Sequence, residues 1–299
     1  MSIKLDFPNP HSAKASAVNI YRSNTRMSVE SLPAILVTLP GNAVTYTDTA
    51  AALNTTYFYR VEVVVGDEVV LSSNVPAGNF PNVGPGPKTL KMGDWNLGYF
   101  GIVPPADLLN FSEMATQLGI TANVAADSTN LGWHKFIRNG KILFMGSTPF
   151  LLSMTWQNVY NLGLIYGVDG SGELPSAAAS SIPAVNQKRT VTKNADTFLV
   201  KAPKINLLST SVPVADQQTF LDGVDGSEWA DLMLRIGVQS NRNSVKGKWY
   251  DLPATGVYVW TQHFQNTGSS LVILRSAAED FANATRSNTY GYLPILEMI

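Results

Sequence analysis

The run Thr55-Thr-Tyr-Phe-Tyr-Arg-Val-Glu-Val-Val-Val65 carries the strongest structural signal in the chain, and Gly66-Asp67 and Glu68-Val-Val-Leu-Ser72 follow it directly. Both runs are rich in β-branched and aromatic residues, which favour strands. Every second residue from Tyr57 to Val65 is apolar, whereas the residues between them are mixed. Successive side chains of a strand point to opposite faces, so one face is apolar throughout. The pattern predicts a hairpin turned at Gly66-Asp67 within a two-sheet β-sandwich.

Shorter runs of the same kind lie on the N-terminal side of this hairpin. They occupy residues 17–21, 34–39 and 44–47, and turn residues such as Pro40-Gly41-Asn42 separate them. We therefore expect residues 1–77 to form one N-terminal sandwich.

Several short motifs follow one another in this region. They are Val18-Asn-Ile-Tyr-Arg-Ser23, Ser31-Leu-Pro33, Val44-Thr-Tyr-Thr-Asp-Thr49, Thr56-Tyr-Phe-Tyr-Arg-Val61 and Ser72-Ser-Asn74. Their order, over about a quarter of the chain, resembles a fibronectin type III-like module of the form common in bacterial and bacteriophage surface proteins. The resemblance implies a fibronectin III or Ig-like β-sandwich. It implies no reaction, because such modules serve as spacers and docking surfaces.

A proline- and glycine-rich segment comes next. Residues 78–88 hold three Gly and three Pro in eleven positions, which neither a helix nor a central strand tolerates. We expect a linker over residues 78–92, between the sandwich and a larger, aromatic-rich α+β domain at 93–299. A stretch near residues 168–187, rich in Gly, Ser and Ala, is either a long surface loop or a further boundary. The expected fold class is multidomain and mainly β, with α+β character in the second part.

Helix and strand patterns alternate in this second region. Residues 107–118 place apolar side chains on one helical face, with Asp107 as the expected N-cap and Gly119 as the stop. Asn139-Gly140 between two strand-like runs predicts a hairpin with a type I′ turn. Further helices are expected over residues 155–165 and after Ser227, and short strands near the C-terminus.

The composition excludes several function classes. The chain has 299 residues, 21 basic and 22 acidic side chains, and no cysteine. A near-neutral chain lacks the cationic surface that nucleic acids and anionic membranes require. Without cysteine, disulfides and cysteine zinc sites are excluded. The N-terminus has no apolar signal sequence, and no run approaches the ~20 apolar residues that span a bilayer. Because only 14% of the residues are charged, against a typical ~25%, we expect neighbouring subunits to cover part of the surface.

The sequence contains no recognisable catalytic or metal-binding motif. The histidines His11, His134 and His263 stand in no zinc-binding arrangement. Residues 222–228 alternate acidic residues with glycine, but the ligand spacing of a calcium loop fails, and a turn before a helix N-cap explains them. The acidic residues available for acid–base catalysis are scattered: Asp94, Glu113, Asp169, Glu173, Glu228 and Asp231. We therefore expect no catalytic residue, cofactor or metal, and keep a glycan-degrading enzyme as a third alternative.

Large aromatic residues gather after the linker. Exposed Trp and Tyr rings beside polar groups bind sugars by stacking, and such rings are also favoured at subunit interfaces. The alternative is that the rings build the core of the second domain. The candidate ligand or interface aromatics are Trp95, Tyr99, Trp133, Trp156, Trp249 and Trp260.

Four motifs stand out in the second region. They are Gly93-Asp-Trp-Asn-Leu-Gly-Tyr-Phe-Gly101, Leu131-Gly-Trp-His-Lys-Phe136, Gly140-Lys-Ile-Leu-Phe144 and Gly291-Tyr-Leu-Pro-Ile-Leu-Glu297. Together they resemble structural proteins of tailed bacteriophages, which frequently end close to Gly-Tyr/Trp-Arg-Pro-Val-Leu-Glu. Here Leu293 and Ile295 replace the usual Arg and Val, so any role of that arginine does not carry over.

This second resemblance implies a virion component of the tail, baseplate, neck or collar, or capsid surface. We expect a homo-oligomer, made in the host cytoplasm, that acts in the virion by binding other virion proteins. The alternative is a host-receptor or carbohydrate-binding adhesin that contacts a host surface glycan. Neither reading involves nucleic acid or a membrane.

Overall fold

Strands dominate the computed structural model, which describes residues 2–127, 131–174, 182–206, 211–212, 226–236, 258–265, 270–275, 281–285 and 288–299. About 40% of the residues are in strands and 9% in helices, so the fold is mainly β, as expected. The chain divides into two units. Unit 1 comprises Met1–Val83 with the turns Gly93–Gly98 and Ile137–Gly140, and unit 2 comprises Gly84–Met92, Tyr99–Phe136 and Lys141–Ile299.

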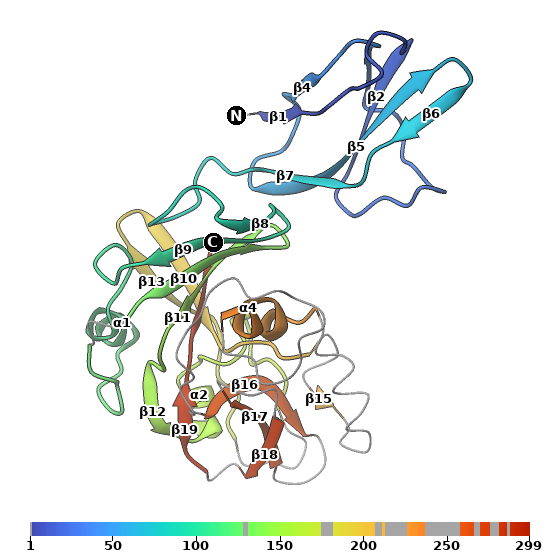
Figure 1. The fold of residues 1–299 in the computed structure, drawn as a ribbon. Helices are drawn as coiled ribbons and strands as arrows, with labels where there is room; N and C mark the ends of the chain where they lie inside the picture. The colour runs from blue at the N-terminus through green and yellow to red at the C-terminus, as the bar shows by residue number, and fades with distance from the viewer. Residues whose placement is uncertain are drawn as a thin grey trace. The chain divides into compact units, whose positions relative to one another are not determined.

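Unit 1 contains two antiparallel sheets (Figure 1). Its strands are β1 (Ile3–Asp6), β2 (Ala17–Ser23), β3 (Val37–Pro40), β4 (Thr45–Asp48), β5 (Thr55–Val65), β6 (Glu68–Leu71) and β7 (Val75–Asn79). β1 and β4 form the smaller sheet; the larger has the order β3-β2-β5-β6, and β7 pairs with the first part of β5. The predicted strands are confirmed. β1 and β7 are additional, and β7 extends the larger sheet two residues beyond the expected boundary at residue 77.

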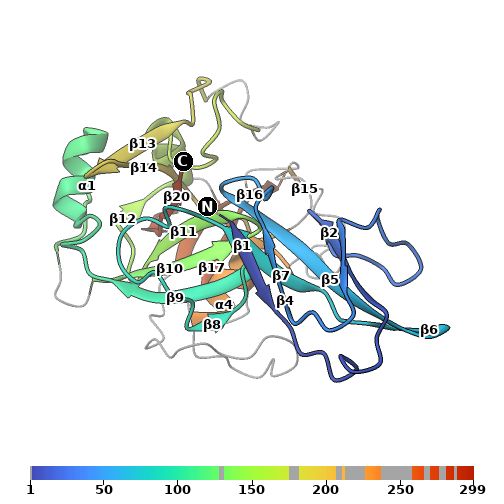
Figure 2. The ribbon, with the colours of Figure 1, turned by 90° about the horizontal axis from the view of Figure 1, so that it is seen from above.

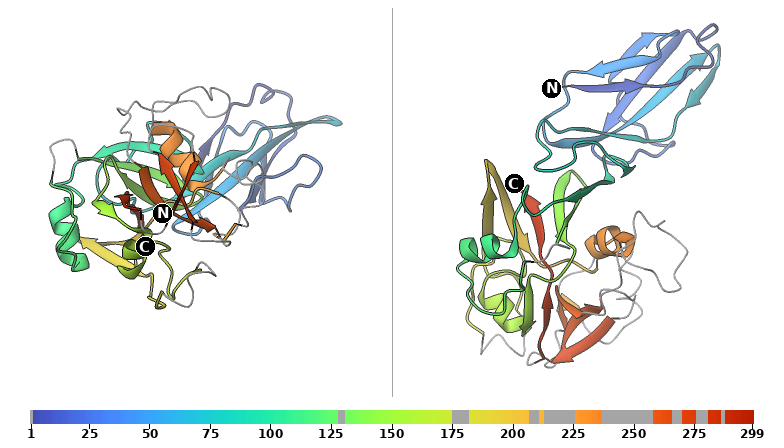
Figure 3. Two further views of the ribbon diagram at one scale, coloured as in Figure 1. Left: turned by 90° about the horizontal axis from the view of Figure 1, so that it is seen from below. Right: turned by 60° about the vertical axis from the view of Figure 1, so that its left-hand side comes forward.

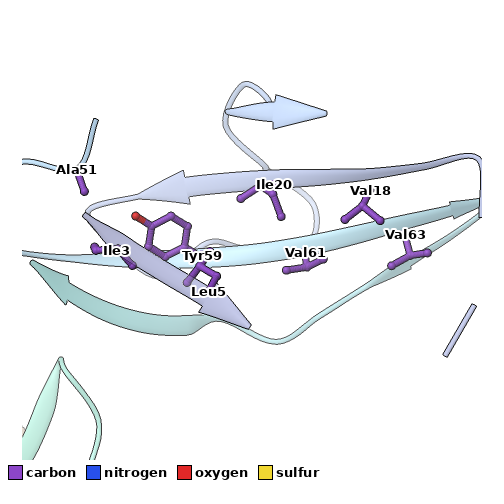
Figure 4. Close-up of a cluster of buried hydrophobic side chains, with 8 residues drawn as sticks. All are labelled: Ile3, Leu5, Val18, Ile20, Ala51, Tyr59, Val61 and Val63. Carbon is purple, nitrogen blue, oxygen red and sulfur yellow. The ribbon is translucent and has the colours of Figure 1, made fainter. Parts of the chain in front are cut away.

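Apolar side chains of the two sheets meet in one core (Figure 4). The buried members are Ile3 and Leu5 of β1, Val18 and Ile20 of β2, Tyr59, Val61 and Val63 of β5, and Ala51. The face of β5 that the sequence predicts to be apolar is thus the face that packs inward. Since β1 lies on the opposite side of this core from β2 and β5, the arrangement is a two-layer sandwich.

A buried carboxylate links the two sheets of unit 1. Asp48, at the end of β4, is fully buried and accepts hydrogen bonds from Tyr59 Oη at 2.6 Å and Arg22 Nη1 at 2.7 Å. Burial raises the pKa of Asp48, but these two donors outweigh it and hold the pKa below its ordinary value. Because removing one partner of a buried ion pair is strongly destabilising, Asp48 helps to fix β4 against β2 and β5.

Two larger sheets follow in the chain. β8 (Met92–Gly93), β9 (Leu97–Val103), β10 (Trp133–Arg138), β11 (Lys141–Gly146), β13 (Arg189–Lys193), β14 (Asp196–Lys201) and β20 (Ile295–Met298) form a sheet in the order β13-β14-β20-β11-β10-β9-β8. The other sheet has the order β12-β19-β16-β17-β18, with β15 beside β16; it contains β12 (Leu151–Met154), β15 (Ser211–Val212), β16 (Tyr258–Gln265), β17 (Ser270–Arg275), β18 (Phe281–Thr285) and β19 (Tyr290–Tyr292).

The C-terminal residues contribute to both of these sheets (Figure 3). β19 lies between β12 and β16, whereas β20 lies between β14 and β11. Leu293-Pro294 separates the two strands, as expected for a proline that cannot donate within a ladder. Tyr292 is fully buried, and its hydroxyl donates to the Leu164 carbonyl at 2.7 Å. The motif Gly291–Glu297 is therefore part of the core of unit 2.

Three helices lie among the described residues: α1 (Phe111–Leu118), α2 (Trp156–Asn161) and α4 (Glu228–Ile236). Asn110 caps α1, not Asp107 as expected. Its side chain accepts from Glu113 N at 2.7 Å, and the Glu113 carboxylate accepts from Asn110 N at 3.0 Å. This capping box satisfies two free N–H groups, so the helix begins three residues later than the apolar pattern suggests. Gly119, with φ +69°, ends the helix as predicted.

Both predicted hairpin turns are confirmed. Asn139 and Gly140 join β10 to β11 with φ +48° and +77°, the left-handed pair that a type I′ turn requires. Gly66-Asp67 joins β5 to β6, and Gly66 has φ +63°. Glycine at this first central position is the signature of a type II′ turn.

Candidate interaction surface

Most of the aromatic residues singled out from the sequence lie in the interior of unit 2. Tyr99, Trp133, Trp156 and Trp260 are buried or nearly so. The three indole N–H groups donate to backbone carbonyls, Trp133 to Leu109 at 2.7 Å, Trp156 to Thr261 at 3.2 Å and Trp260 to Met154 at 2.7 Å. These four residues are core residues, so neither a sugar nor a neighbouring subunit reaches their rings in the folded chain.

Trp95 is the exception, since it is only half-buried and belongs to unit 1. Its ring stacks on Phe80 with centroids 5.6 Å apart and planes 2° from parallel. It also lies against Gly78, where a Cβ would come within 2.6 Å of the ring. Thr56 Oγ1 donates to the Trp95 carbonyl at 2.9 Å. Trp249 lies outside the described residues.

The histidines are dispersed through the fold. His134 is buried beside Tyr99, with Nδ1 3.2 Å from the Tyr99 hydroxyl. Burial lowers the pKa of His134 to about 4 and raises the pKa of Tyr99 to about 12, so both groups are neutral at physiological pH. His263 is buried in the second sheet of unit 2, where its Nδ1 accepts from Ile205 N at 3.4 Å, and His11 is exposed.

A cluster of four charges forms in unit 2, in which Lys201, Glu228 and Glu297 are largely buried and Lys141 is exposed. Lys201 Nζ lies 2.8 Å from Glu228 Oε1 and 2.8 Å from Glu297 Oε2, and Lys141 Nζ lies 2.6 Å from Glu297 Oε1. Burial lowers the pKa of Lys201, but the two carboxylates outweigh it and raise the pKa above its ordinary value. The two positive and two negative charges neutralise one another, which does not favour a role as general acid or base. The cluster instead links α4, β11, β14 and β20.

The other carboxylates considered for catalysis are dispersed as well. Asp94 accepts from the backbone N–H groups of its own turn, Glu113 caps α1 and pairs with Lys193, and Asp169 is exposed beside Lys188. Among the described residues, no three His, Asp or Glu side chains lie close enough together to hold a metal ion. Glu297, which no sequence motif marks as a site residue, accepts from both Lys141 and Lys201.

Lys135 is the second buried cation that the sequence did not signal. It lies in β10 with no exposed surface, and its Nζ donates to the carbonyls of Pro87 at 2.6 Å, Pro85 at 2.9 Å and Gly84 at 3.4 Å. The ammonium group also lies 4.8 Å from the centre of the Phe100 ring. The second half of the expected linker is therefore packed onto the sheet of unit 2, because its carbonyls solvate a buried lysine.

Exposed apolar residues concentrate on unit 1. On β6, Val69 is 61% and Val70 is 47% exposed, and Val75 at the start of β7 is 45% exposed. We call these three residues the valine edge. β6 ends the larger sheet of unit 1, and in Figure 2 the hairpin of β5 and β6 extends past the rest of that unit. Exposed valines on a strand at the edge of a sheet favour contact with another polypeptide.

No family model, curated protein or solved structure matches this chain. Within the part of the chain that the structure describes, none of the helices has the length and apolar character needed to cross a bilayer.

The sequence signalled the strand at residues 68–72 but not its position in the sheet. The two adjacent valines, Val69 and Val70, point to opposite faces of the strand. They could have indicated its unusual position, since a strand with one buried face alternates apolar and polar residues. The chemistry that this surface offers is backbone hydrogen bonding and apolar contact, both suited to binding protein.

Proposed function

We propose that the chain is a structural component of a tailed bacteriophage virion, acting by protein–protein assembly in the tail, baseplate, neck or collar, or capsid surface. In this proposal unit 1 is a fibronectin III or Ig-like docking module and unit 2 is the larger folded part of the same chain. The chain works as a homo-oligomer within the virion and in contact with other virion proteins. It has no catalytic role, and needs no cofactor.

The observation that carries the proposal is the valine edge, where exposed valines lie along the edge strand of the larger sheet of unit 1. A monomer that works alone gains nothing from exposed valines beside unpaired backbone groups, since such an edge promotes association. The low charge of the chain, 14%, points in the same direction. The phage setting is supported by the sequence motifs, above all Gly291–Glu297. The residues of this motif are buried and Glu297 is ion-paired, so the motif contributes to the fold.

The adhesin alternative depended on exposed aromatic rings. Of the six candidate residues, four are buried and Trp95 is half covered by Phe80 and Gly78. The enzyme alternative depended on paired carboxylates, and among the described acidic residues Glu228 and Glu297 approach each other only across Lys201. No described observation favours either alternative over assembly.

Fractionation of a lysate tests the proposal. The tailed phage that encodes the chain is propagated, its particles are banded on a density gradient, and an antibody against the recombinant chain is used to probe every fraction. We expect the signal at particle density, resistant to a salt wash that removes exposed ion pairs. Recovery of the chain only as a free monomer in the soluble fractions would contradict the proposal.

A further inference from the structure

β6 is an edge strand among the strands that the structure describes. β6 pairs with β5 on one side and is the last strand of its sheet. No described strand pairs with its other side. In both views of Figure 3 the β5–β6 hairpin again lies at the periphery of unit 1, which leaves this side of the strand accessible.

The hydrogen-bond pattern decides which residues of β6 point their backbone groups outward. Ser72 N donates to Val61 O at 2.8 Å, and in the same register Val63 pairs with Val70. In an antiparallel ladder, hydrogen-bonded and non-hydrogen-bonded pairs alternate, so Val70 directs its N–H and C=O toward β5. Val69 and Leu71 therefore direct theirs outward, to the free edge.

We propose that β6 pairs antiparallel with β6 of a second copy of this chain, with Val70 opposite Val70 and Val69 opposite Leu71. The alternation of hydrogen-bonded and non-hydrogen-bonded pairs permits this register, because in both copies Val69 and Leu71 direct their backbone N–H and C=O groups toward the outer edge. Val70 then forms the non-hydrogen-bonded pair on the two-fold axis, where opposite side chains approach most closely.

No like-charge contact opposes a second copy as the occupant. In this register Glu68 lies opposite Ser72 and Asp67 lies opposite Ser73, so no acidic residue faces another although both strands carry the same sequence. The contact between copies is apolar at its centre and polar at its ends, which is the usual anatomy of an interface.

The opposite edge of the same sheet differs in the features that discourage pairing. β3 ends in Pro40, which has no N–H to donate, and its residues Val37 and Leu39 are half-buried against the core. β6 contains no proline and no lysine. Natural sheets use such residues to discourage pairing at their edges, so of the two edges β6 is the one open to pairing.

The pairing rests on the proposed function, because a contact of this size is weak on its own. A four-residue strand buries far less than the ~1,000 Å² of a stable interface. In a particle that holds many copies close together, the high effective concentration makes the weak contact effective. We expect the isolated chain to dimerise weakly and reversibly.

A single-cysteine experiment tests the register, since the chain contains no cysteine of its own. In the proposed pairing the two Val70 Cα atoms lie ~4.5 Å apart, within the span of a disulfide. The full chain with Val70→Cys, incubated with oxidised glutathione, is expected to form a covalent dimer at least about tenfold faster than two controls. Val69→Cys places its thiols more than ~7 Å apart, and Val29→Cys puts a thiol on an exposed loop of the same unit.

Two outcomes would overturn the proposal. One is dimerisation of V70C no faster than that of V29C, and the other is V69C as the fastest variant, which would mean a different register. Sedimentation velocity gives a second measurement: the mass of the unmodified chain should rise with concentration, and Val70→Lys should abolish that rise. Because Val70 is exposed, V70K should fold normally, and self-association unchanged in V70K would overturn the pairing.

The experiment also separates this proposal from the one on which it rests. Chains found in phage particles but without V70C cross-linking would leave the assembly role intact and remove the β6 contact. Rapid cross-linking of V70C by a chain that is absent from particles would keep the contact and remove the phage role.

Discussion

Lys135 is fully buried, although a lysine side chain normally keeps its charged group in water. Its ammonium group is buried in unit 2 against three carbonyls of the Gly84–Pro87 segment and two aromatic rings. Burial, together with the positive charge of Lys88, lowers the pKa of Lys135 to about 7. In the unfolded chain the pKa is the ordinary ~10.4. Between these two values the unfolded state binds more protons than the folded state.

Because of Lys135, the free energy of unfolding should therefore rise with pH. The free energy of unfolding of the wild type, minus that of Lys135→Met, is expected to grow by up to about 1.4 kcal/mol per pH unit between about pH 7 and pH 10. The gain is lost as the pH falls toward 7, where the folded chain must also bind the proton. Denaturant unfolding followed by tryptophan fluorescence measures it in unit 2, because every tryptophan except Trp95 belongs to that unit. A difference that stays constant from pH 7 to 10 would contradict the assigned burial.

Residues of this kind are the least predictable from sequence. Trp133, His134 and Lys135 are consecutive, and all three are buried, although only the first is apolar enough to suggest it. Burial of Lys135 depends on carbonyls about fifty residues earlier in the chain. Four of the six aromatic candidates, Tyr99, Trp133, Trp156 and Trp260, are buried for the same reason, since exposure is set by tertiary packing and not by residue type.

At the scale of elements, local signals predicted more. The structure confirms the two hairpin turns, at Gly66-Asp67 and Asn139-Gly140, and the helix end at Gly119. These were predictable because few residue types adopt a positive φ readily, so Gly and Asn mark such positions in the sequence. The start of α1 was misplaced by three residues, since Asp107 and Asn110 are both good caps and only Asn110 is followed by Glu at the third position. β1 and β7 were missed because four or five residues with mixed patterning give no periodicity.

The ion-pair cluster holds four elements together, so its loss should be costly. Removing Glu297 by Glu297→Ala leaves Lys201 with one carboxylate and Lys141 with none, and is expected to destabilise unit 2 by about 3–5 kcal/mol. The matched control is Lys188→Ala, which breaks an exposed pair with Asp169 in the same unit and should change stability by less than about 0.5 kcal/mol. Thermal unfolding of the two variants compares them directly. Equal melting temperatures would show that the cluster does not stabilise the fold.

At the scale of the whole molecule, the C-terminal residues complete both sheets of unit 2. β20 is a central strand, between β14 and β11, and β19 is a central strand of the second sheet. Strand order of this kind could not be predicted from the sequence, because the pairing partners of β20 lie about 95 and 150 residues earlier in the chain. The predicted domains, a sandwich at residues 1–77 and a larger part at 93–299, depend on strand patterning and on the proline- and glycine-rich segment between them.

Truncation after Asn288 should therefore affect one unit selectively. Hydrogen exchange measured by mass spectrometry is expected to show loss of protection in β10, β11 and β14, whose sheet loses a central strand. β2 and β5 should keep their protection, since the core cluster of unit 1 contains no residue beyond Ala77. Protection retained in β11 and β14 would contradict the central position of β20.

The central claim is that this chain is a building component of a virion, present in many copies. Quantitative mass spectrometry of gradient-purified particles, with isotope-labelled peptides from both units as standards, counts the chains per particle. We predict several copies in every particle, in a number that matches a ring or axis of the particle, with both units equally represented. Fewer than one chain per particle, or a signal that disappears as the particles are purified further, would contradict the account.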